Sequence, residues 1–400
     1  MIRLPEVRVA LVTDWFSVGG GGARVIEQIL HLFPECHLFS LVDVMPTSDR
    51  TLIRNKRVTT SYIQKLPGME SGNFYRYVPI MPAAVESLDL SEYDLVFSTS
   101  HGFAKGVITS PDQLHICYCH SPLRFGWDNR SLYFDESNNR SRFQRLLTKF
   151  KKVANQAILH HQRLWDASTA SRVDIFFASS HYTAARIGKL YRREATVMYP
   201  PIDLRIFKPD PVASREFYVA SGPMLPYKEL DVIVETFRRM PDRKLVVMGD
   251  GPEFEKLSNI VGRCPNISLL GQVPQEVQVQ HLQRARAFIT LAKEDFGLPH
   301  VEAQACGTPV IALQAGGALE NVIPLGQEKP TGMFIKEATS MALTKAIEEF
   351  ESLPTPFKID DCRENAQRFS GDSFRHTMAV TIEKIWQDYT ASENQEEQAA

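Results

Sequence analysis

The chain has 400 residues, of which 44% are hydrophobic and 23% are charged, and its formal net charge at pH 7 is −2. This composition is that of an ordinary folded globular protein, and the charge excludes a global positive field of the kind that draws proteins to nucleic acid. The chain is longer than a domain with a single hydrophobic core usually is, so we expect two domains.

The N-terminal residues and the cysteines indicate a cytoplasmic protein. The sequence MIRLPEVRVALVTDWF does not form a secretory signal, because its apolar run is short and is interrupted by Arg8. No stretch approaches the roughly 18 apolar residues of a membrane span. The six cysteines are scattered, and CYC at 117–119 lacks the two-residue spacer of a redox pair or zinc site. We therefore expect free thiols in a reducing compartment.

Short apolar runs alternate with helical periods along the first half of the chain. A helical pattern, ARVIEQILHLF, follows the first apolar run and a glycine loop. Continuous apolar runs of this kind predict strands that are buried on both faces, as in a parallel sheet covered by helices. The predicted strands lie at residues 7–15, 36–43, 93–100, 114–120 and 174–180.

A proline-rich segment at residues 196–211, TVMYPPIDLRIFKPDP, interrupts this alternation. Proline fixes φ and blocks strand pairing, so we place the domain boundary there. The N-terminal domain is predicted at 1–203 and the C-terminal domain at 204–371. A long helix at about 372–390 is predicted to pack back on the first domain, and the polar tail 391–400 is predicted to be disordered.

The alternation resumes in the second half, with apolar runs at 217–222, 244–250, 267–271, 287–292 and 309–313. The sequence thus predicts an α/β protein with two doubly wound, Rossmann-like domains that face a cleft. Ligands of such domains bind beyond the carboxyl ends of the parallel strands. The loops that directly follow strands are therefore the places to look for a site.

One such loop begins the stretch KEDFGLPHVEAQACGTPVIALQAGGALENV. Glu294 lies in the loop after a predicted strand. Pro299 suits the first position of a helix, and Gly307 suits the left-handed residue after it. This places Glu302 in the first helical turn, where a carboxylate that merely compensates the helix dipole is the alternative explanation.

A diglycine follows the next predicted strand of this stretch. Gly316 and Gly317 permit a close approach of backbone to a ligand. The helix predicted after them would direct its N–H groups and its positive dipole end at a pyrophosphate. A diglycine that only forms a turn is the alternative.

The stretch resembles the donor-sugar motif of retaining glycosyltransferases of family 4, which have the two-domain GT-B fold. The match comprises two glutamates separated by seven residues, a Gly-x-Pro-Val-Ile-Ala strand and a Gly-Gly-x-x-Glu turn. By this resemblance Glu294 binds hydroxyls of the donor sugar and Glu302 binds the ribose hydroxyls. The amides of Gly316 and Gly317 face the diphosphate. Carboxylates suit hydroxyl recognition, because they accept strong hydrogen bonds.

A second motif, YCHSPLRFGWD from Tyr118 to Asp128, resembles the signature of bacterial mannosyltransferases of the O-antigen and exopolysaccharide type. By this resemblance His120 lies beside the transferred sugar, and a capping histidine is the alternative. Arg124 would bind phosphate or acceptor, or it would form a structural ion pair.

Gly21 and Gly22 belong to the glycine loop after the first strand, GGGGARVIEQIL. Such a loop lets backbone amides approach a phosphate or an acceptor. Dinucleotide-binding proteins share this feature, but the glycine spacing is not G-x-G-x-x-G, which argues against an NAD enzyme. Ala23 stands where this subgroup often has Glu.

The chain departs from the family after the first strand of the second domain, in SGPMLPYKELDVIVETF. The family has an Arg and a Lys there, which neutralise the diphosphate leaving group. Lys228 matches the Lys, but Pro223 replaces the Arg. Loss of one preorganised cation would raise the barrier by about 3 kcal/mol. Another cation such as Arg124 could replace it, the enzyme could be slow or use an unusual donor, or the protein could bind a sugar nucleotide without turnover.

The resemblance implies a retaining glycosyltransferase that moves a hexose, with GDP-mannose the favoured donor, to a saccharide or lipid-linked saccharide in cell-surface polysaccharide synthesis. His120, Lys228 and Glu294 are the candidate catalytic residues. The chain contains no Asp-x-Asp motif, so we expect no metal and no cofactor beyond the donor. The alternatives are a non-catalytic scaffold protein that binds sugar nucleotides, or an epimerase of GT-B fold.

The segment at 140–165 carries seven Arg or Lys residues and no acid, with apolar residues at helical spacing. A basic amphipathic helix of this kind can lie on an anionic membrane. A helix that packs on its domain with a solvated basic face is the alternative. Membrane contact would place a cytoplasmic protein at the inner face of the membrane, near a lipid-linked acceptor.

Overall fold

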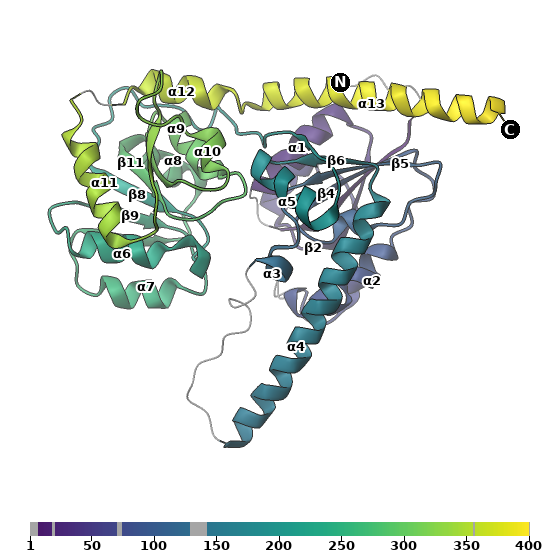
Figure 1. Ribbon diagram of the computed structural model, residues 1–400, viewed down its shortest axis with the longest axis horizontal. Coiled ribbons are helices and arrows are strands. Elements are labelled where there is room, and N and C mark those ends of the chain that lie inside the picture. Colours follow the sequence, from purple (N-terminus) through teal and green to yellow (C-terminus); the bar gives the residue numbers. More distant parts are fainter. Residues whose placement is uncertain (1–6, 18–20, 70–73, 129–141, 355–356, 400) are drawn as a thin grey trace. The chain divides into compact units, whose positions relative to one another are not determined.

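The computed structural model describes residues 7–17, 21–69, 74–128, 142–354 and 357–399, and the chain divides into two compact units. The first unit comprises Met1–Tyr199 together with Phe374–Ala400, and the second comprises Pro200–Ser373 (Figure 1). The chain leaves the first unit within the proline-rich segment, where fixed φ angles prevent the continuation of a strand.

The first unit is built on a parallel sheet of seven strands in the order β3-β2-β1-β4-β5-β6-β7. Its strands are β1 (Val9–Phe16), β2 (His37–Asp43), β3 (Val58–Thr60), β4 (Leu95–Ser100), β5 (Leu114–Cys119), β6 (Ile175–Ala178) and β7 (Thr196–Val197). The strand order reverses between β1 and β4, so the loops after these strands diverge and leave room for a ligand at the carboxyl edge.

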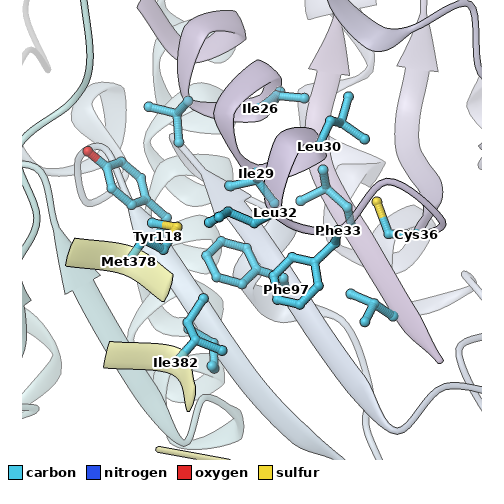
Figure 2. Close-up of a cluster of buried hydrophobic side chains, with 14 of the residues drawn as sticks. Ile26, Ile29, Leu30, Leu32, Phe33, Cys36, Phe97, Tyr118, Met378 and Ile382 are labelled. Carbon is cyan, nitrogen blue, oxygen red and sulfur yellow. The ribbon is translucent and has the colours of Figure 1, made fainter. Parts of the chain in front are cut away.

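Helices cover both faces of this sheet (Figure 1). The helices of this unit are α1 (Gly21–Leu32), α2 (Met81–Glu86), α3 (Arg124–Trp127), α4 (Arg142–Ser168), α5 (His181–Tyr191) and α13 (Gly371–Ala399). The apolar side of α1 packs Ile29 and Leu30 against Phe97 of β4, and α13 contributes Met378 and Ile382 to the same core (Figure 2). The C-terminal helix is therefore part of the first unit.

Helix α13 continues to Ala399, so the prediction of a disordered tail at 391–400 was wrong for residues 391–399. Segment 391–399 is polar, which suggested disorder, but it is rich in Ala, Glu and Gln. These residues have high intrinsic helix propensity and extend an existing helix at little cost.

The second unit has a parallel sheet of six strands in the order β10-β9-β8-β11-β12-β13. Its strands are β8 (Phe217–Ser221), β9 (Leu245–Met248), β10 (Ile267–Gly271), β11 (Ala285–Thr290), β12 (Val310–Leu313) and β13 (Gly332–Ile335). Its helices are α6 (Leu230–Arg238), α7 (Phe254–Val261), α8 (Gln275–Arg284), α9 (Leu298–Ala305), α10 (Ala318–Asn321), α11 (Ser340–Ser352) and α12 (Ile359–Gln367). The order reverses between β8 and β11.

The two parallel sheets confirm the predicted α/β class with two doubly wound units. All the predicted strands form. The strands β3, β7 and β13 were not predicted. Strands β3 and β7 have only three and two residues, which give too little periodicity. The six cysteines are free, as expected.

Candidate functional site

In the second unit, the predicted site residues gather at the carboxyl edge of the sheet, where the strand order reverses. Lys228 follows β8 and Glu294 follows β11, and these strands are neighbours. The Lys228 Nζ donates a hydrogen bond to Glu294 Oε1, and the two side chains are only 10% and 13% exposed. Two residues that lie 66 positions apart, in separate motifs, thus form one ion pair.

The diglycine packs directly against the loop that carries Glu294. Gly316 has φ +62°, and a Cβ there would overlap the backbone carbonyl of Glu294. A Cβ on Gly317 would overlap the backbone of Phe296. The Gly317 N–H donates to the Glu294 carbonyl at 2.9 Å. We expected this amide to face a diphosphate, whereas in this structure it holds the Glu294 loop.

The helix that carries Glu302 begins one residue earlier than predicted. Gly297 adopts φ +88°, which allows α9 to start at Leu298, so Pro299 is its second residue. The prediction that Glu302 lies in the first turn was therefore wrong, and Glu302 follows that turn. Gly307 has φ +77° just after the helix, as predicted.

The helix after the diglycine, α10, has only four residues. We predicted a helix whose dipole would favour a pyrophosphate. A single turn sums few peptide dipoles, so the helix is shorter than a strong dipole requires. The pyrophosphate site at its N-terminus stays a prediction.

Glu302 contacts a residue that the sequence did not single out. Gln278 of α8 donates from Nε2 to Glu302 Oε2 at 3.1 Å. The Glu302 side chain is half-buried, so its carboxylate is both oriented and accessible. No local pattern indicates Gln278, because it lies 24 residues from Glu302 in the sequence.

A buried polar cluster fixes the backbone between the two glutamates. His300 and Asn321 pair through Nδ1 and Oδ1 at 3.1 Å, and Asn321 Nδ2 donates to the Phe296 carbonyl at 2.5 Å. Burial lowers the pKa of His300, which favours the neutral ring. Gln304 extends the cluster by donating to the Asn321 carbonyl at 2.8 Å. The loop after β11 is thereby held in one conformation.

In the first unit, His120 directly follows β5, and its N–H donates to the Ser100 carbonyl at 2.9 Å. Its Nε2 atom is buried and has no hydrogen-bond partner among the residues that the structure describes. Burial lowers the pKa of His120 well below its ordinary value, and the neighbouring His101 lowers it further. A neutral imidazole offers one donor and one acceptor to a ligand hydroxyl.

Gly22 and His120 lie close together, as a shared site requires. A Cβ on Gly22 would lie 3.0 Å from His101 Cε1 and 3.7 Å from His120 Nε2, so glycine leaves room for these rings. Gly21 is the first residue of α1, whereas the preceding glycines at 19–20 lie outside the described residues.

Asp14, two residues before the end of β1, fixes the turn that carries His101. Its buried carboxylate accepts hydrogen bonds from the N–H groups of His101, Phe103 and Ala104 at 2.5, 2.7 and 2.6 Å. The sequence did not indicate this role, because the partners lie at least 87 residues away.

The remaining residues of the 118–128 motif anchor it to the first unit. Arg124 is the first residue of α3 and is half-buried. Trp127 Nε1 donates to Asp166 Oδ2 at 2.7 Å, and Asp166 forms a fully buried ion pair with Lys105 at 3.1 Å. Asp128 pairs with Arg186 of α5. The end of this motif is therefore structural.

Within the described ranges, no group of three or more His, Cys, Asp or Glu side chains is arranged to hold a metal ion. Over the same ranges, none of the helices is long and apolar enough to cross a membrane.

Part of the chain, which includes the second unit's candidate site residues, matches a known protein family. The family model "Glycosyl transferases group 1" matches residues 203–369. A GDP-mannose-dependent alpha-(1-6)-phosphatidylinositol monomannoside mannosyltransferase of Mycolicibacterium smegmatis is 29% identical over 202 residues, which cover 44% of this chain and 52% of that protein. A GDP-mannose-dependent monoacylated alpha-(1-6)-phosphatidylinositol monomannoside mannosyltransferase of Corynebacterium glutamicum is 27% identical over 184 residues, 38% of this chain and 48% of that protein. The chain thus spans about half the length of the curated relatives it matches.

Among solved structures, HepE of Anabaena in complex with UDP and glucose aligns with a TM-score of 0.68 at 16% identity. The alignment covers 94% of this chain and 99% of that one, so the likeness in fold includes both units. The two-unit architecture is the GT-B fold, and residues 203–369 match the family model of the group 1 glycosyl transferases.

Proposed function

We propose that the protein is a retaining glycosyltransferase that moves a hexose from a nucleotide sugar to a saccharide or lipid-linked saccharide in cell-surface polysaccharide synthesis. The observation that carries this proposal is the Lys228–Glu294 pair at the switch point of a group 1 glycosyltransferase domain. Glu302 lies on the helix that follows the same loop, and its half-buried carboxylate can accept hydroxyl donors.

In this proposal Lys228 and Glu294 take different roles when the donor binds. The ammonium of Lys228 neutralises charge that develops on the leaving diphosphate, and Glu294 accepts hydrogen bonds from sugar hydroxyls. His120, a neutral imidazole with a buried Nε2, contacts the transferred sugar. Retention is part of the proposal, and NMR of the anomeric proton early in the reaction tests it.

GDP-mannose is the proposed donor. The relatives in Mycolicibacterium and Corynebacterium are named as GDP-mannose-dependent mannosyltransferases, which supports mannose and guanine. The HepE structure contains UDP and glucose, which makes UDP-glucose the donor to test beside it. Release of GDP or UDP from each sugar nucleotide, measured with the wild type, decides between them.

We further propose that turnover needs no metal and no cofactor besides the donor. The lysine would then neutralise the diphosphate without a bridging cation. Donor turnover in excess EDTA tests this: an unchanged rate supports it, and loss of the rate with recovery on addition of Mg²⁺ or Mn²⁺ contradicts it.

Contact with the inner face of the membrane is the proposed route to a lipid-linked acceptor. Helix α4 extends away from the sheet of its unit, and the sequence of its N-terminal half is basic (Figure 1). Further along α4, Val153 is 65% exposed. Sedimentation with phosphatidylglycerol vesicles but not with phosphatidylcholine vesicles would support membrane contact. A protein that sediments with neither kind of vesicle would contradict it.

A non-catalytic scaffold protein that binds sugar nucleotides is the second candidate, and Pro223 favours it. This proline stands exposed in the loop after β8, where a cation would otherwise assist the leaving group. Nucleotide binding without any donor turnover, with a panel of saccharides present, would favour the scaffold. Turnover that is lost in Glu294→Gln favours the enzyme.

A further inference from the structure

Three loops border the ion pair of Lys228 and Glu294 at the carboxyl edge of the second unit's sheet. They follow the neighbouring strands β8, β11 and β12 and comprise residues 222–229, 291–297 and 314–317. We call them the edge loops. Glu294 already neutralises the charge of Lys228 in this structure. A bound diphosphate carries more negative charge than one lysine neutralises, so Lys228 alone would leave part of that charge uncompensated.

The sequence of the edge loops contains one other candidate cation. The loops read GPMLPYKE, LAKEDFG and QAGG in chain order. Within these loops, all of which the structure describes, Lys293 is the one Lys or Arg besides Lys228. Glu229, Glu294 and Asp295 supply negative charge in the same loops. The edge loops therefore have no surplus of positive charge, and a diphosphate bound there needs both lysines.

Backbone contacts place Lys293 beside the residues proposed for the diphosphate. A Cβ on Gly316 would lie 3.3 Å from the backbone nitrogen of Glu294, which belongs to the peptide bond between Lys293 and Glu294. The Glu294 carbonyl accepts from the Gly317 N–H at 2.9 Å, and its carboxylate accepts from Lys228. Lys293 thus directly precedes the residue that contacts both Lys228 and the diglycine.

The register of β8 and β11 also brings Lys293 to the level of the loop after β8. Phe288 of β11 pairs with Val219 of β8 in a parallel arrangement. Continued from residue 288 to residue 292, this register sets Ala292 level with Pro223. Neighbouring strands lie about 4.8 Å apart, a spacing that the long side chain of a lysine can cross.

Lys293 is exposed, whereas Lys228 and Glu294 are mostly buried. A ligand can therefore reach Lys293 without entering the buried ion pair. We propose that Lys293 is a second cation that contacts the diphosphate of the bound nucleotide. The proposal rests on the proposed function and adds a binding residue to it. Solvent and salt weaken exposed ion pairs, so the contribution of Lys293 is modest and decreases at high ionic strength.

Titration calorimetry with GDP, UDP and inorganic pyrophosphate tests the proposal, and GMP and UMP are the matched ligands that lack the second phosphate. Lys293→Gln should weaken the binding of the diphosphates by about fivefold, the upper end for an exposed ion pair, and should leave the monophosphates unchanged. Lys293→Arg keeps the charge and should retain the wild-type affinity. Lys336→Gln is the control and should also retain it, because Lys336 is exposed and follows β13, which β12 separates from β11.

Pro223→Arg provides a rescue of the Lys293→Gln variant. Because residue 223 lies level with residue 292, an arginine there adds a cation on the neighbouring strand. It should raise the diphosphate affinity of Lys293→Gln by a larger factor than that of the wild type, in which Lys293 already supplies part of the charge. Equal factors in the two backgrounds would contradict a shared ligand group.

Three further results would overturn the proposal: wild-type diphosphate affinity in Lys293→Gln, an equal loss for monophosphates and diphosphates, or an equal loss in Lys336→Gln. The proposed function is decided separately, by donor turnover of the wild type. A wild type that binds diphosphates through Lys293 but turns over no sugar nucleotide retains this proposal and refutes the enzyme. A wild type that binds neither nucleoside diphosphate nor pyrophosphate overturns both.

Discussion

Lys228 and Glu294 form an ion pair between the loops that follow the neighbouring strands β8 and β11. Both side chains are mostly buried, so each charge depends on the other for compensation. A bound diphosphate would offer Lys228 a second anionic partner and would free Glu294 to accept hydroxyl donors. Under the proposed function, the pair would exchange partners when a sugar nucleotide binds.

Substitution of Glu294 by Gln should abolish most of the activity without unfolding the protein. The amide oxygen still accepts from Lys228, but it binds a sugar hydroxyl less strongly than a carboxylate does. We expect donor turnover to fall by about 100-fold or more, the magnitude typical of a lost transition-state contact. The measurement is nucleotide release, with the melting temperature recorded in parallel.

Glu328→Gln provides the control for this substitution, since Glu328 is exposed and lies outside the site. It should retain wild-type turnover. Normal turnover in Glu294→Gln would remove Glu294 from the proposed mechanism.

Substitution of Pro223 by Arg should accelerate donor turnover. Pro223 is exposed, and its carbonyl, which accepts from the Leu225 N–H at 2.8 Å, is retained in the variant. A second cation near the leaving group would lower the barrier by up to about 3 kcal/mol, or roughly 100-fold. The initial rate at saturating donor measures the effect. A rate equal to that of the wild type would mean that another cation already serves the diphosphate.

Gly316 should be far less tolerant of alanine than Gly326. Both glycines have positive φ, +62° and +87°, so alanine costs each about 1–2 kcal/mol in backbone strain. At Gly326 a Cβ would meet open space, whereas at Gly316 it would overlap the Glu294 carbonyl. We expect Gly316→Ala to lose about 3 kcal/mol or more in the free energy of unfolding and to weaken nucleotide binding.

Urea unfolding and nucleotide titration measure these two effects. In the matched variant Gly326→Ala, the free energy of unfolding should fall only by the cost of backbone strain, and nucleotide binding should be normal. Equal losses of stability in the two variants would show that the packing of the diglycine on the Glu294 loop has no energetic consequence.

The sequence was sufficient to predict the two parallel sheets and the site residues Lys228 and Glu294. Buried parallel strands are continuous apolar runs, and they were recognisable for that reason. Lys228 and Glu294 were found in separate motifs, and the strand order brings them together. The contacts of Asn321, Gln278 and Asp14 were not predictable, because each joins residues far apart in the chain and leaves no local pattern.

The errors in the helices have a different cause. The predicted helix after Gly317 is a single turn, and the polar tail continues α13. Polarity and glycine placement indicate where helices can end, but they do not determine how many turns tertiary packing retains.

His115 should make the protein less stable as the pH falls below about 6.5. Burial lowers the pKa of His115 to about 4, while its Nδ1 donates to the Arg172 carbonyl and its Nε2 accepts from Ser98. Because the unfolded chain, with a pKa near 6.5, binds the proton more tightly, stability is complete above about pH 6.5 and is lost toward pH 4.

Protonation linked to His115 alone should lower the free energy of unfolding by about 2 kcal/mol between pH 7 and pH 5. His115→Asn should reduce the pH dependence by that amount, although its stability at pH 7 is lower. Urea unfolding at the two pH values measures the difference. An identical pH dependence in the variant and the wild type would contradict the assignment.

The most direct test of the proposed function is thermal unfolding of the wild type with GDP, UDP, ADP, NAD and the corresponding sugar nucleotides. A ligand at about 100 times its dissociation constant adds about 2.7 kcal/mol to the stability, which gives a measurable rise in melting temperature. We predict stabilisation by GDP and GDP-mannose, and its loss in Lys228→Ala. Stabilisation by none of the nucleoside diphosphates, or by NAD alone, would contradict the assignment of a nucleotide-sugar site.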